Sequence, residues 1–238
     1  MIESPQNEKL KLVRKLRERK HREREGLFAT EGEDLLEAGL AAGAVPRLVL
    51  TAPDAEIDGE EVDPDLLAGV STLGSGTRVI AIWPLTWAER AEAPCLYLHG
   101  VADPGNVGTI IRTADALIGS SVVLGPECAD PFSPKAVRAS MGSVFSQPPL
   151  RGGVEETPEP RTALVAHGGE DLGALAGTAT ICLGAEREGL PGEVVSRCGT
   201  QVTIPLRGGA ESLNVAAAAA IAAQRISSPA MNGGQPDA

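Results

Sequence analysis

The sequence has few aromatic residues, few cysteines and no long apolar run. Aromatics make up 3% of the 238 residues, so aliphatic side chains and alanine must supply the hydrophobic core. The longest apolar stretch, from Val215 to Ala223, is far shorter than the roughly 20 residues of a membrane-spanning helix. The N-terminus is charged, unlike a secretory signal. We therefore expect a soluble protein of one or two domains.

Several common site signatures are also missing. The four cysteines, Cys95, Cys128, Cys182 and Cys198, are widely spaced and form no CxxC pair, so a metal knuckle or a redox motif is not expected. Buried, reduced thiols in a cytoplasmic protein are the better interpretation. Neither GxGxxG nor GxxxxGK[ST] occurs, which argues against a dinucleotide fold or a P-loop.

Positive charge is scarce overall but concentrated at one end. The net charge is −11, yet residues 1–25 carry nine Lys and Arg against five acids. Residues 6–24 predict one helix with a narrow apolar face formed by Leu10, Val13 and Leu16. Its basic faces are either a solvated surface with charge pairs or a contact for an RNA backbone, because phosphate binding depends on the local patch rather than on net charge.

The order of the remaining elements predicts an α/β protein. A helix at 30–43, a strand at 47–50, a helix at 64–72 and a strand at 78–83 form a small α/β unit, and prolines bracket a linker at 84–93. Apolar strands follow at 95–101, 121–124, 162–166, 180–183 and 201–205, with helices between them near 107–118, 134–141, 172–176 and 190–197. This alternation predicts a parallel sheet covered by helices on both faces.

Two strand ends carry residues that suggest a ligand site, since ligands of open parallel sheets bind at the carboxyl ends of the strands. After the first strand, Asn106 is placed to cap a helix that carries Arg112, although a capped helix with a surface arginine explains the same pattern. After the strand at 180–183, Gly184 and Gly189 allow tight backbone geometry, and Glu186 could interact with a cation. An ordinary strand–helix turn is the alternative.

A third strand end, Ile204–Gln224, combines a proline, a Gly-Gly loop and an alanine-rich helix. Ser212 is expected to cap that helix, and Ala216–Ala220 leave little side-chain bulk, so other backbones can pack closely against it. An alanine-rich core helix is the simpler interpretation of this segment taken alone.

In this order and spacing, the three segments resemble the three motifs of the SpoU methyltransferases in the SPOUT superfamily. N-x-G-x-x-x-R is carried by Asn106, Gly108 and Arg112, and G-x-E-x-x-G by Gly184, Glu186 and Gly189. The third motif is carried by Ile204, Pro205, Gly208, Ser212, Leu213, Asn214 and Val215. The one departure is Leu206, where methionine is common, and this change nearly conserves volume. The resemblance extends over most of residues 9–226.

The resemblance implies a fold, a cofactor and a reaction. The catalytic domain, 94–226, would contain a C-terminal trefoil knot, preceded by the basic helix and RNA substrate-binding domain at 1–83 and followed by a disordered tail at 227–238. S-adenosyl-L-methionine would bind at Gly184, Ile204, Leu206 and Leu213, with no metal ion. The implied reaction is methylation of a ribose 2′-hydroxyl in RNA, by a homodimer, at a site formed by Asn106, Arg112, Glu186, Ser212 and Asn214.

Three alternatives remain at this stage. The RNA could be tRNA, although a separate N-terminal domain favours ribosomal RNA by analogy. The protein could be a non-catalytic RNA-binding protein of the same fold, or a dinucleotide-dependent oxidoreductase without the usual glycine fingerprint. The role of Arg112 is also open: the family's matching arginine is often taken as a base, but a guanidinium stays protonated in proteins and could instead stabilise an alkoxide.

Overall fold

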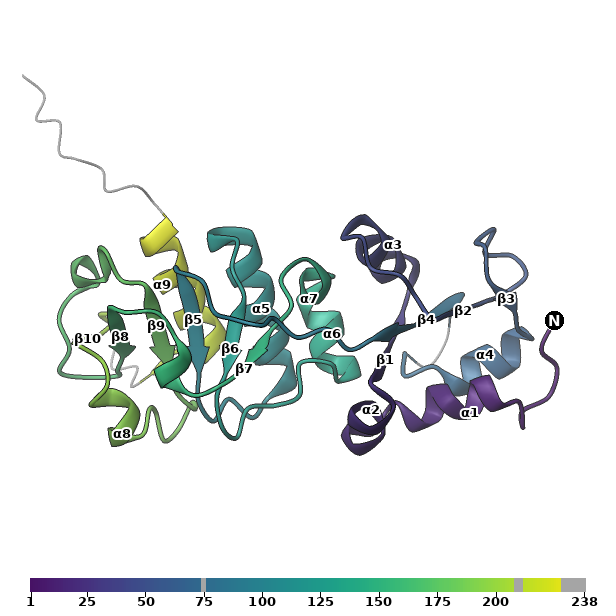
Figure 1. Ribbon diagram of the computed structural model, residues 1–238, viewed down its shortest axis with the longest axis horizontal. Coiled ribbons are helices and arrows are strands. Elements are labelled where there is room, and N and C mark those ends of the chain that lie inside the picture. Colours follow the sequence, from purple (N-terminus) through teal and green to yellow (C-terminus); the bar gives the residue numbers. More distant parts are fainter. Residues whose placement is uncertain (74–75, 208–211, 228–238) are drawn as a thin grey trace, which may run out of the picture.

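The protein consists of two α/β units arranged along its long axis, as the computed structural model shows (Figure 1). The structure describes residues 1–73, 76–207 and 212–227. Gly208 of the third motif therefore lies outside the described residues, as does the predicted tail beyond Ser227, which itself ends a helix. None of the helices in these three ranges is both long and apolar enough to span a membrane.

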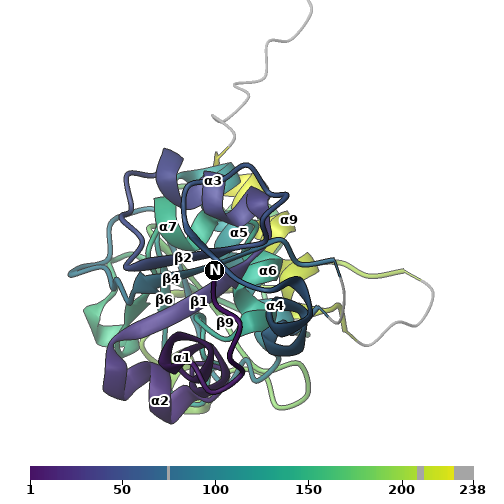
Figure 2. The ribbon, with the colours of Figure 1, turned by 90° about the vertical axis from the view of Figure 1, so that its right-hand side faces the viewer.

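The N-terminal unit is a four-stranded sheet with helices on both sides. Its strands are β1 (Leu27–Glu31), β2 (Leu48–Thr51), β3 (Glu60–Glu61) and β4 (Val79–Pro84), in the order β1-β4-β2-β3. Its helices are α1 (Glu8–Lys15), α2 (Arg19–Glu25), α3 (Glu33–Ala41) and α4 (Pro64–Val70). Figures 1 and 2 both place α3 on one side of this sheet and α1 and α2 on the other.

The predicted single helix over 6–24 is wrong, because the helix is interrupted between Lys15 and Arg19, where α1 ends and α2 begins. The backbone carbonyls of Leu16 and Arg17, left free where α1 ends, each accept a hydrogen bond from the Arg22 guanidinium at 2.7 Å. That side chain folds back from α2, so a buried arginine stabilises the turn. No glycine or proline marks this break, which explains why the helical pattern concealed it.

The start of the second helix was also predicted wrongly. Thr30 and Glu31 belong to strand β1, which pairs antiparallel with β4, and α3 begins only at Glu33. Along β4, side chains alternate between two clusters: Ile80 and Ile82 pack with the apolar residues of α1 and α4, and the residues between them pack towards α3. β4 is buried on both faces, in agreement with the apolar run that predicted a strand at 78–83.

The C-terminal unit is a six-stranded, all-parallel sheet, which confirms the predicted fold class. The strands are β5 (Cys95–Leu98), β6 (Val122–Leu124), β7 (Leu150–Arg151), β8 (Arg161–Leu164), β9 (Thr180–Leu183) and β10 (Thr200–Val202). The α-helices are α5 (Pro104–Ile118), α6 (Pro134–Ser140), α7 (Ser143–Ser146), α8 (Gly192–Val195) and α9 (Val215–Ser227). Two 3₁₀ turns complete the unit, η1 (Val154–Glu156) and η2 (Leu172–Leu175).

Both faces of this sheet are covered, but unequally. One face, which includes Leu96 and Leu98, packs against α5, α9 and η2 in the largest hydrophobic cluster. The other face, with Cys95 and Tyr97, is covered by η1 and the short helix α8. The helix predicted over 190–197 is present but shorter, since α8 covers only Gly192–Val195, and the short strand β7 was not predicted. All four cysteines are free thiols, two of them fully buried.

Strand order places a topological switch point at the centre of the sheet. The strand order is β10-β8-β9-β5-β6-β7. From β5 the chain adds β6 and β7 on one side of β5, and it later places β9 on the opposite side of β5. The connection after β5 therefore runs towards β6 and the connection after β9 runs towards β10, in opposite directions along the sheet. Ligands of open α/β sheets bind in the crevice that such a divergence creates.

The two units share a hydrophobic cluster and a buried ion pair. Phe28 and Trp83 of the N-terminal unit pack with Phe132 and Val144 of the C-terminal unit. The Arg22 guanidinium donates two hydrogen bonds to one Asp130 carboxylate oxygen, at 2.6 and 3.0 Å. An apolar contact and a charge pair therefore both join the two units.

We expect Arg22→Met to destabilise the protein by about 3–5 kcal/mol, the usual effect of removing one partner of a buried ion pair. The Arg22 and Asp130 side chains are 4% and 10% exposed, so the remaining carboxylate would be poorly solvated. Urea unfolding measures this loss. The matched control is Arg24→Met: its side chain is 61% exposed, and the loss should stay below about 1 kcal/mol. Equal losses in both variants would contradict the buried-pair interpretation.

Candidate active site

All three predicted motif segments meet at the carboxyl edge of the parallel sheet. The first follows β5 and opens α5, the second follows β9, and the third lies between β10 and α9. Helices α5 and α9 pack against each other on the face of the sheet above this edge. Segments that are about 100 residues apart in the sequence are thus neighbours in space, as expected for loops at a switch point.

A chain of hydrogen bonds links one residue from each segment. Asn106 Nδ2 donates to Glu186 Oε1, and Asn106 Oδ1 accepts a hydrogen bond of 3.1 Å from Asn214 Nδ2. Asn214 Oδ1 in turn accepts from the backbone N–H groups of Ala216 and Ala217, at 2.9 and 3.3 Å. Each amide group uses both ends, so the three segments hold one another in a fixed orientation.

The structure corrects two predicted helix caps. Asp103, not Asn106, caps α5: its carboxylate accepts from the Asn106 backbone N–H at 3.0 Å. Asn214, not Ser212, caps α9. In both cases a residue two or three positions away caps the helix, so the side chain of the predicted capping residue is available for other contacts. Asn106 uses that freedom to join the network of Glu186 and Asn214.

Asp103 was missed by the sequence analysis, and it joins the start of α5 to α6. Its second carboxylate oxygen pairs with Lys135 Nζ of α6 at 2.6 Å. The Lys135 hydrogen bond, followed by the Asn106 backbone N–H, lowers the pKa of Asp103, so the cap stays ionised. An aspartate followed directly by proline, shortly before a predicted helix, is a signal that could have identified it.

Arg112 lies apart from this network. It is exposed on α5 and makes no hydrogen bond or ion pair with any other residue that the structure describes. Six residues separate it from Asn106, which corresponds to about 9 Å along a helix axis. None of Asn106, Glu186 and Asn214 contacts Arg112 through a hydrogen bond or an ion pair, and the Arg112 guanidinium is available to a substrate.

Gly108, the middle residue of the first motif, explains how closely α5 and α6 approach. A side chain at this position would place its Cβ only 2.1 Å from the backbone oxygen of Ala136 in α6. The two helices make extensive contact along this face. Gly108 is therefore required for packing, and it also positions the helix that carries Asn106 and Arg112.

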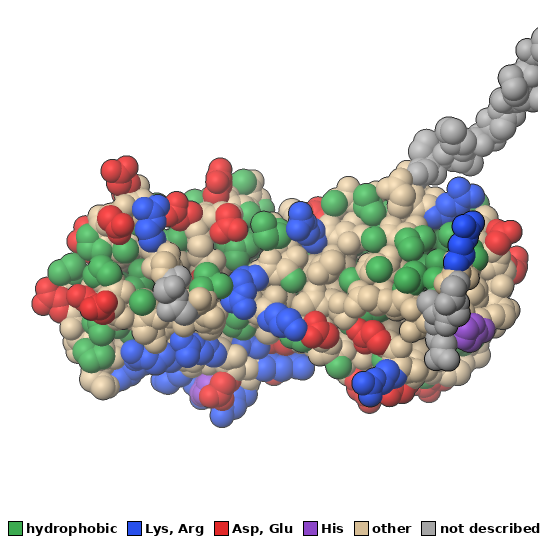
Figure 3. Space-filling view, turned by 180° about the vertical axis from the view of Figure 1, so that it is seen from behind, with side chains coloured by type: hydrophobic (Ala, Val, Ile, Leu, Met, Phe, Trp, Pro, Cys, Tyr) green, Lys and Arg blue, Asp and Glu red, His purple; other side chains and the backbone are tan. Residues whose placement is uncertain are grey.

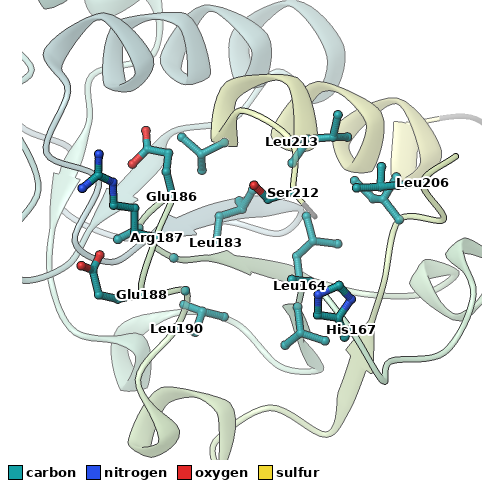
Figure 4. Close-up of a pocket in the computed structure, with 18 residues that line it drawn as sticks. Leu164, His167, Leu183, Glu186, Arg187, Glu188, Leu190, Leu206, Ser212 and Leu213 are labelled. Atoms are coloured by element: carbon teal, nitrogen blue, oxygen red, sulfur yellow. The ribbon is translucent and has the colours of Figure 1, made fainter. Parts of the chain in front are cut away.

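A cavity of about 690 Å³ opens beside the network. All four residues predicted to hold the cofactor, Gly184, Ile204, Leu206 and Leu213, line it, and so do Glu186 and Ser212 of the predicted catalytic set. Figure 4 shows the labelled side chains around this space, contributed by the ends of β8 and β9 and by the loops after β8, β9 and β10. The cavity does not include Asn106, Arg112 or Asn214.

The lining also contains residues that the sequence analysis missed. Leu164 and His167 come from the end of β8 and the loop after it, and Leu190 from the turn before α8. The β8 strand was predicted, but its loop carries no motif, so only the strand order could have shown that it adjoins β9. In the described part of the chain, no group of three His, Cys, Asp or Glu side chains is placed to bind a metal ion.

The turn after β9 is built by two glycines. The Gly189 backbone N–H donates to the Ala185 carbonyl at 2.9 Å, and Gly189 has a φ of +69°, a conformation that favours glycine. A Cβ on Gly184 would lie 2.1 Å from the Gly189 carbonyl carbon and 2.3 Å from the Leu190 nitrogen. The tight geometry expected of this motif therefore comes from backbone packed on backbone, and the turn presents Glu186 at its tip.

Comparison with known proteins agrees with this geometry. The model of the SpoU rRNA Methylase family matches residues 93–224, and that of the MRM3-like substrate binding domain matches residues 7–82. The chain belongs to the SpoU rRNA Methylase family. It is 32% identical to the 23S rRNA (guanosine(2553)-2'-O)-methyltransferase RlmP of Bacillus subtilis, over 92% of this chain and 96% of that protein.

Two solved structures share the arrangement of both units. An AdoMet-bound rRNA methyltransferase from Sinorhizobium meliloti has a TM-score of 0.84 and 29% identity, covering 94% of this chain and 95% of that one. The SpoU methyltransferase AviRb from Streptomyces viridochromogenes, in complex with AdoMet, has a TM-score of 0.80 and 26% identity, covering 92% and 97%. These relatives confirm the predicted family and the N-terminal substrate-binding domain.

Proposed function

We propose that the protein transfers a methyl group from S-adenosyl-L-methionine to a ribose 2′-hydroxyl of ribosomal RNA. The observation that carries this proposal is the position of Glu186, which lines the cavity and also accepts a hydrogen bond from Asn106. Glu186 therefore belongs both to the lining of a small-molecule cavity and to the hydrogen-bonded network of motif residues. The names of the relatives, which are rRNA 2′-O-methyltransferases, favour ribosomal RNA over tRNA.

The cavity fits the proposed cofactor in size and chemistry. Its volume of about 690 Å³ lies within the range of small-molecule sites. Leu164, Leu183 and Leu206 provide apolar walls for a purine ring, and the loop backbones at the strand ends provide polar groups. Glu186 supplies a negative charge at the rim, which favours a cationic group. When bound, S-adenosyl-L-methionine supplies a methyl group on a positively charged sulfur.

The residues of this chain then have two tasks, alignment and charge stabilisation. The network of Glu186, Asn106 and Asn214 fixes the loops that face the substrate, and alignment of reacting groups can supply much of the acceleration. A ribose 2′-oxygen becomes more negative as it loses its proton. The exposed guanidinium of Arg112 would stabilise that oxygen or hold an adjacent phosphate.

The test is methyl transfer to RNA by the purified protein. Ribosomal RNA from cells that lack the gene is incubated with the protein and radiolabelled S-adenosyl-L-methionine, and modified riboses are mapped by resistance to alkaline cleavage. We expect incorporation at a 2′-oxygen of ribosomal RNA and none in tRNA. Incorporation into tRNA alone would replace the proposed substrate, and cofactor binding without any transfer would indicate a non-catalytic RNA-binding protein.

We further propose that the N-terminal unit binds the RNA backbone through exposed basic residues of α1 and α2. Figure 3 shows Lys and Arg side chains gathered along the lower edge of this unit, where these two helices lie. Arg22, counted at first among these charges, is buried in the ion pair with Asp130 and is not available. Leu10, Val13 and Leu16 are core residues, so deleting 1–25 would unfold the unit rather than test its charge.

Replacing Lys15, Lys20 and Arg24 with glutamine should weaken RNA binding and reduce its salt dependence. All three side chains are exposed and lie outside the hydrophobic core. The slope of log K against log salt should fall by about 0.7–0.9 for each phosphate that the variant no longer neutralises. Filter binding at several salt concentrations measures it, and S-adenosyl-L-methionine affinity serves as the control. An unchanged slope would show that this basic surface is only solvated.

We also propose that the protein is a homodimer that associates through α9. Ala217 and Ile221 are exposed and lie four residues apart, so they form a small apolar patch on the face of α9 that points away from the sheet. Ala217→Trp, which puts a bulky side chain on this patch, should shift the protein to monomers in sedimentation experiments and lower methyl transfer. A wild-type monomer with full activity would contradict the proposal.

A further inference from the structure

A second cavity, of about 360 Å³, lies at the junction of the two units, away from the proposed cofactor site. We call it the junction groove. It is formed by Arg19 of α2, Trp87 of the linker, the loop after β6 (125–131), and Arg151 with the two glycines that follow it. None of these residues lines the larger cavity. Neither the three motifs nor the proposed transfer reaction accounts for a groove at this place.

Arg151 presents a flat cationic surface in this groove. Its guanidinium lies over the Trp87 ring, 4.5 Å from the ring centroid, and the Trp87 ring is itself held edge-on by Phe132 at 5.0 Å. The Arg151 side chain is still 54% exposed. One face of the guanidinium is therefore fixed by the tryptophan while the rest of the side chain remains accessible. Unpaired RNA bases stack on arginine planes of this kind.

A carboxylate already occupies the position between the two arginines of the groove. Glu23 Oε1 accepts a hydrogen bond from Arg19 Nε at 2.9 Å and from Arg151 at 3.3 Å. The Arg19 hydrogen bond, with the charges of both arginines, lowers the pKa of Glu23. Two arginines that converge on one carboxylate have the geometry that also suits a phosphate. Glu23 thus marks an anion position, and an RNA phosphate would compete for it.

The groove is connected to the proposed reaction site by backbone hydrogen bonds. The loop after β6, which forms one wall, accepts from Gly100 at the Pro126 carbonyl (3.0 Å) and donates from Ala129 to the Val101 carbonyl (2.9 Å). The loop it contacts continues to Asp103, the cap of the helix that carries Asn106. Strands β9, β5, β6 and β7 are parallel neighbours, so the loops after β5 and β9 lie at the same edge of the sheet as the loops after β6 and β7 that form the groove. The groove and the motif loops therefore lie along one edge of the sheet.

We propose that the junction groove binds one unpaired nucleotide of the RNA substrate, next to the nucleotide that is methylated. Its base stacks on the accessible face of Arg151, and its phosphate pairs with Arg19 and Arg151 in place of Glu23. The Arg22–Asp130 ion pair holds α2, and with it Arg19, at the correct distance from the loop after β6. The proposal rests on the proposed function only in taking RNA as the substrate.

Binding of a short oligoadenylate, measured without cofactor by fluorescence anisotropy, tests the groove. Arg151→Lys keeps the charge but removes the plane, so affinity for the single strand should fall about tenfold, as for the loss of one stacked base, while the salt slope stays unchanged. Affinity for a paired RNA duplex of equal length should not change. Arg90→Ala, at an 82% exposed arginine in the linker outside the groove, is the control and should bind as the wild type does.

Glu23→Gln gives the complementary test, because it should increase affinity for the oligoadenylate several-fold by removing the competing anion. A variant that fails to fold cannot gain affinity, so this result is independent of stability. Wild-type affinity in both Arg151→Lys and Glu23→Gln would overturn the proposal, as would equal losses on single-stranded and duplex RNA. Absence of methyl transfer by the wild type would overturn the proposed function alone, since these binding measurements involve no transfer.

Discussion

Arg112→Ala is expected to abolish methyl transfer while the fold and S-adenosyl-L-methionine binding are retained. Arg112 is exposed, and within the described residues no hydrogen bond or ion pair holds it, so its removal leaves no buried group unsatisfied. It also lies outside the cavity that we assign to the cofactor. The predicted loss is therefore confined to the reaction, and we expect at least about a hundredfold fall in turnover, as for removal of a group that stabilises a developing negative charge.

Arg112→Lys separates the two roles that remain open for this residue. Lysine retains a positive charge but loses the planar fork that can hold two oxygens at once. A large loss in this variant would indicate that geometry matters, whereas near-normal turnover would indicate that charge alone is sufficient. Single-turnover methylation, with cofactor affinity measured by calorimetry in parallel, provides both readouts. Near-normal turnover in Arg112→Ala would remove this residue from the proposed reaction.

Gly184→Ala is the second substitution for which we expect a large effect. The new methyl group would meet the backbone of Gly189 at 2.1 Å and that of Leu190 at 2.3 Å, and backbone atoms cannot move aside as a flexible side chain can. The turn must open, which displaces Glu186 and the adjoining cavity wall. We expect cofactor affinity to fall by at least about tenfold, because misplacing a binding wall by an ångström has effects of that size or larger.

The matched control for this change is Gly192→Ala. Gly192 begins α8, shortly after the turn that contains Gly184 and Gly189, but a Cβ on Gly192 would meet no atom within 4 Å. Isothermal titration with S-adenosyl-L-methionine should therefore give wild-type affinity for Gly192→Ala and a weakened one for Gly184→Ala. If both variants bind equally well, the turn is more adaptable than its packing indicates and Gly184 does not shape the site.

The sequence predicted the catalytic unit far better than the N-terminal one, for a physical reason. Strands such as Cys95–Leu98 and Thr180–Leu183 are buried on both faces and read as continuous apolar runs between turns, so each could be recognised on its own. In the N-terminal unit, β1 follows directly on α2 through a single glycine, Gly26, and its edge residues look like a helix start. The local sequence pattern therefore cannot distinguish a strand from a helix start at this position, because the burial of β1 in the folded unit decides between them.

The site shows the same limit in a different form. The sequence could place Asn106, Glu186 and Asn214 at three loop positions, because motifs at strand ends mark them. It could not show that the three side chains form one hydrogen-bonded chain, since this depends on the pairing of β5 with β9 and on the packing of α5 against α9. For the same reason it assigned the caps to Asn106 and Ser212, close in sequence to the residues that do cap the helices. The trefoil knot stays a prediction of the resemblance.

The shared cluster at the junction limits how RNA specificity could be re-engineered in this protein. Replacing residues 1–83 with the corresponding part of a relative would leave Phe132 and Val144 facing a foreign surface, and Asp130 without its arginine. A functional chimera therefore needs a boundary that is not contiguous in sequence: the donor segment must include the loop and helices from Asp130 to Phe145 together with the N-terminal unit. The unit that is exchanged intact would be defined by packing, not by the linker.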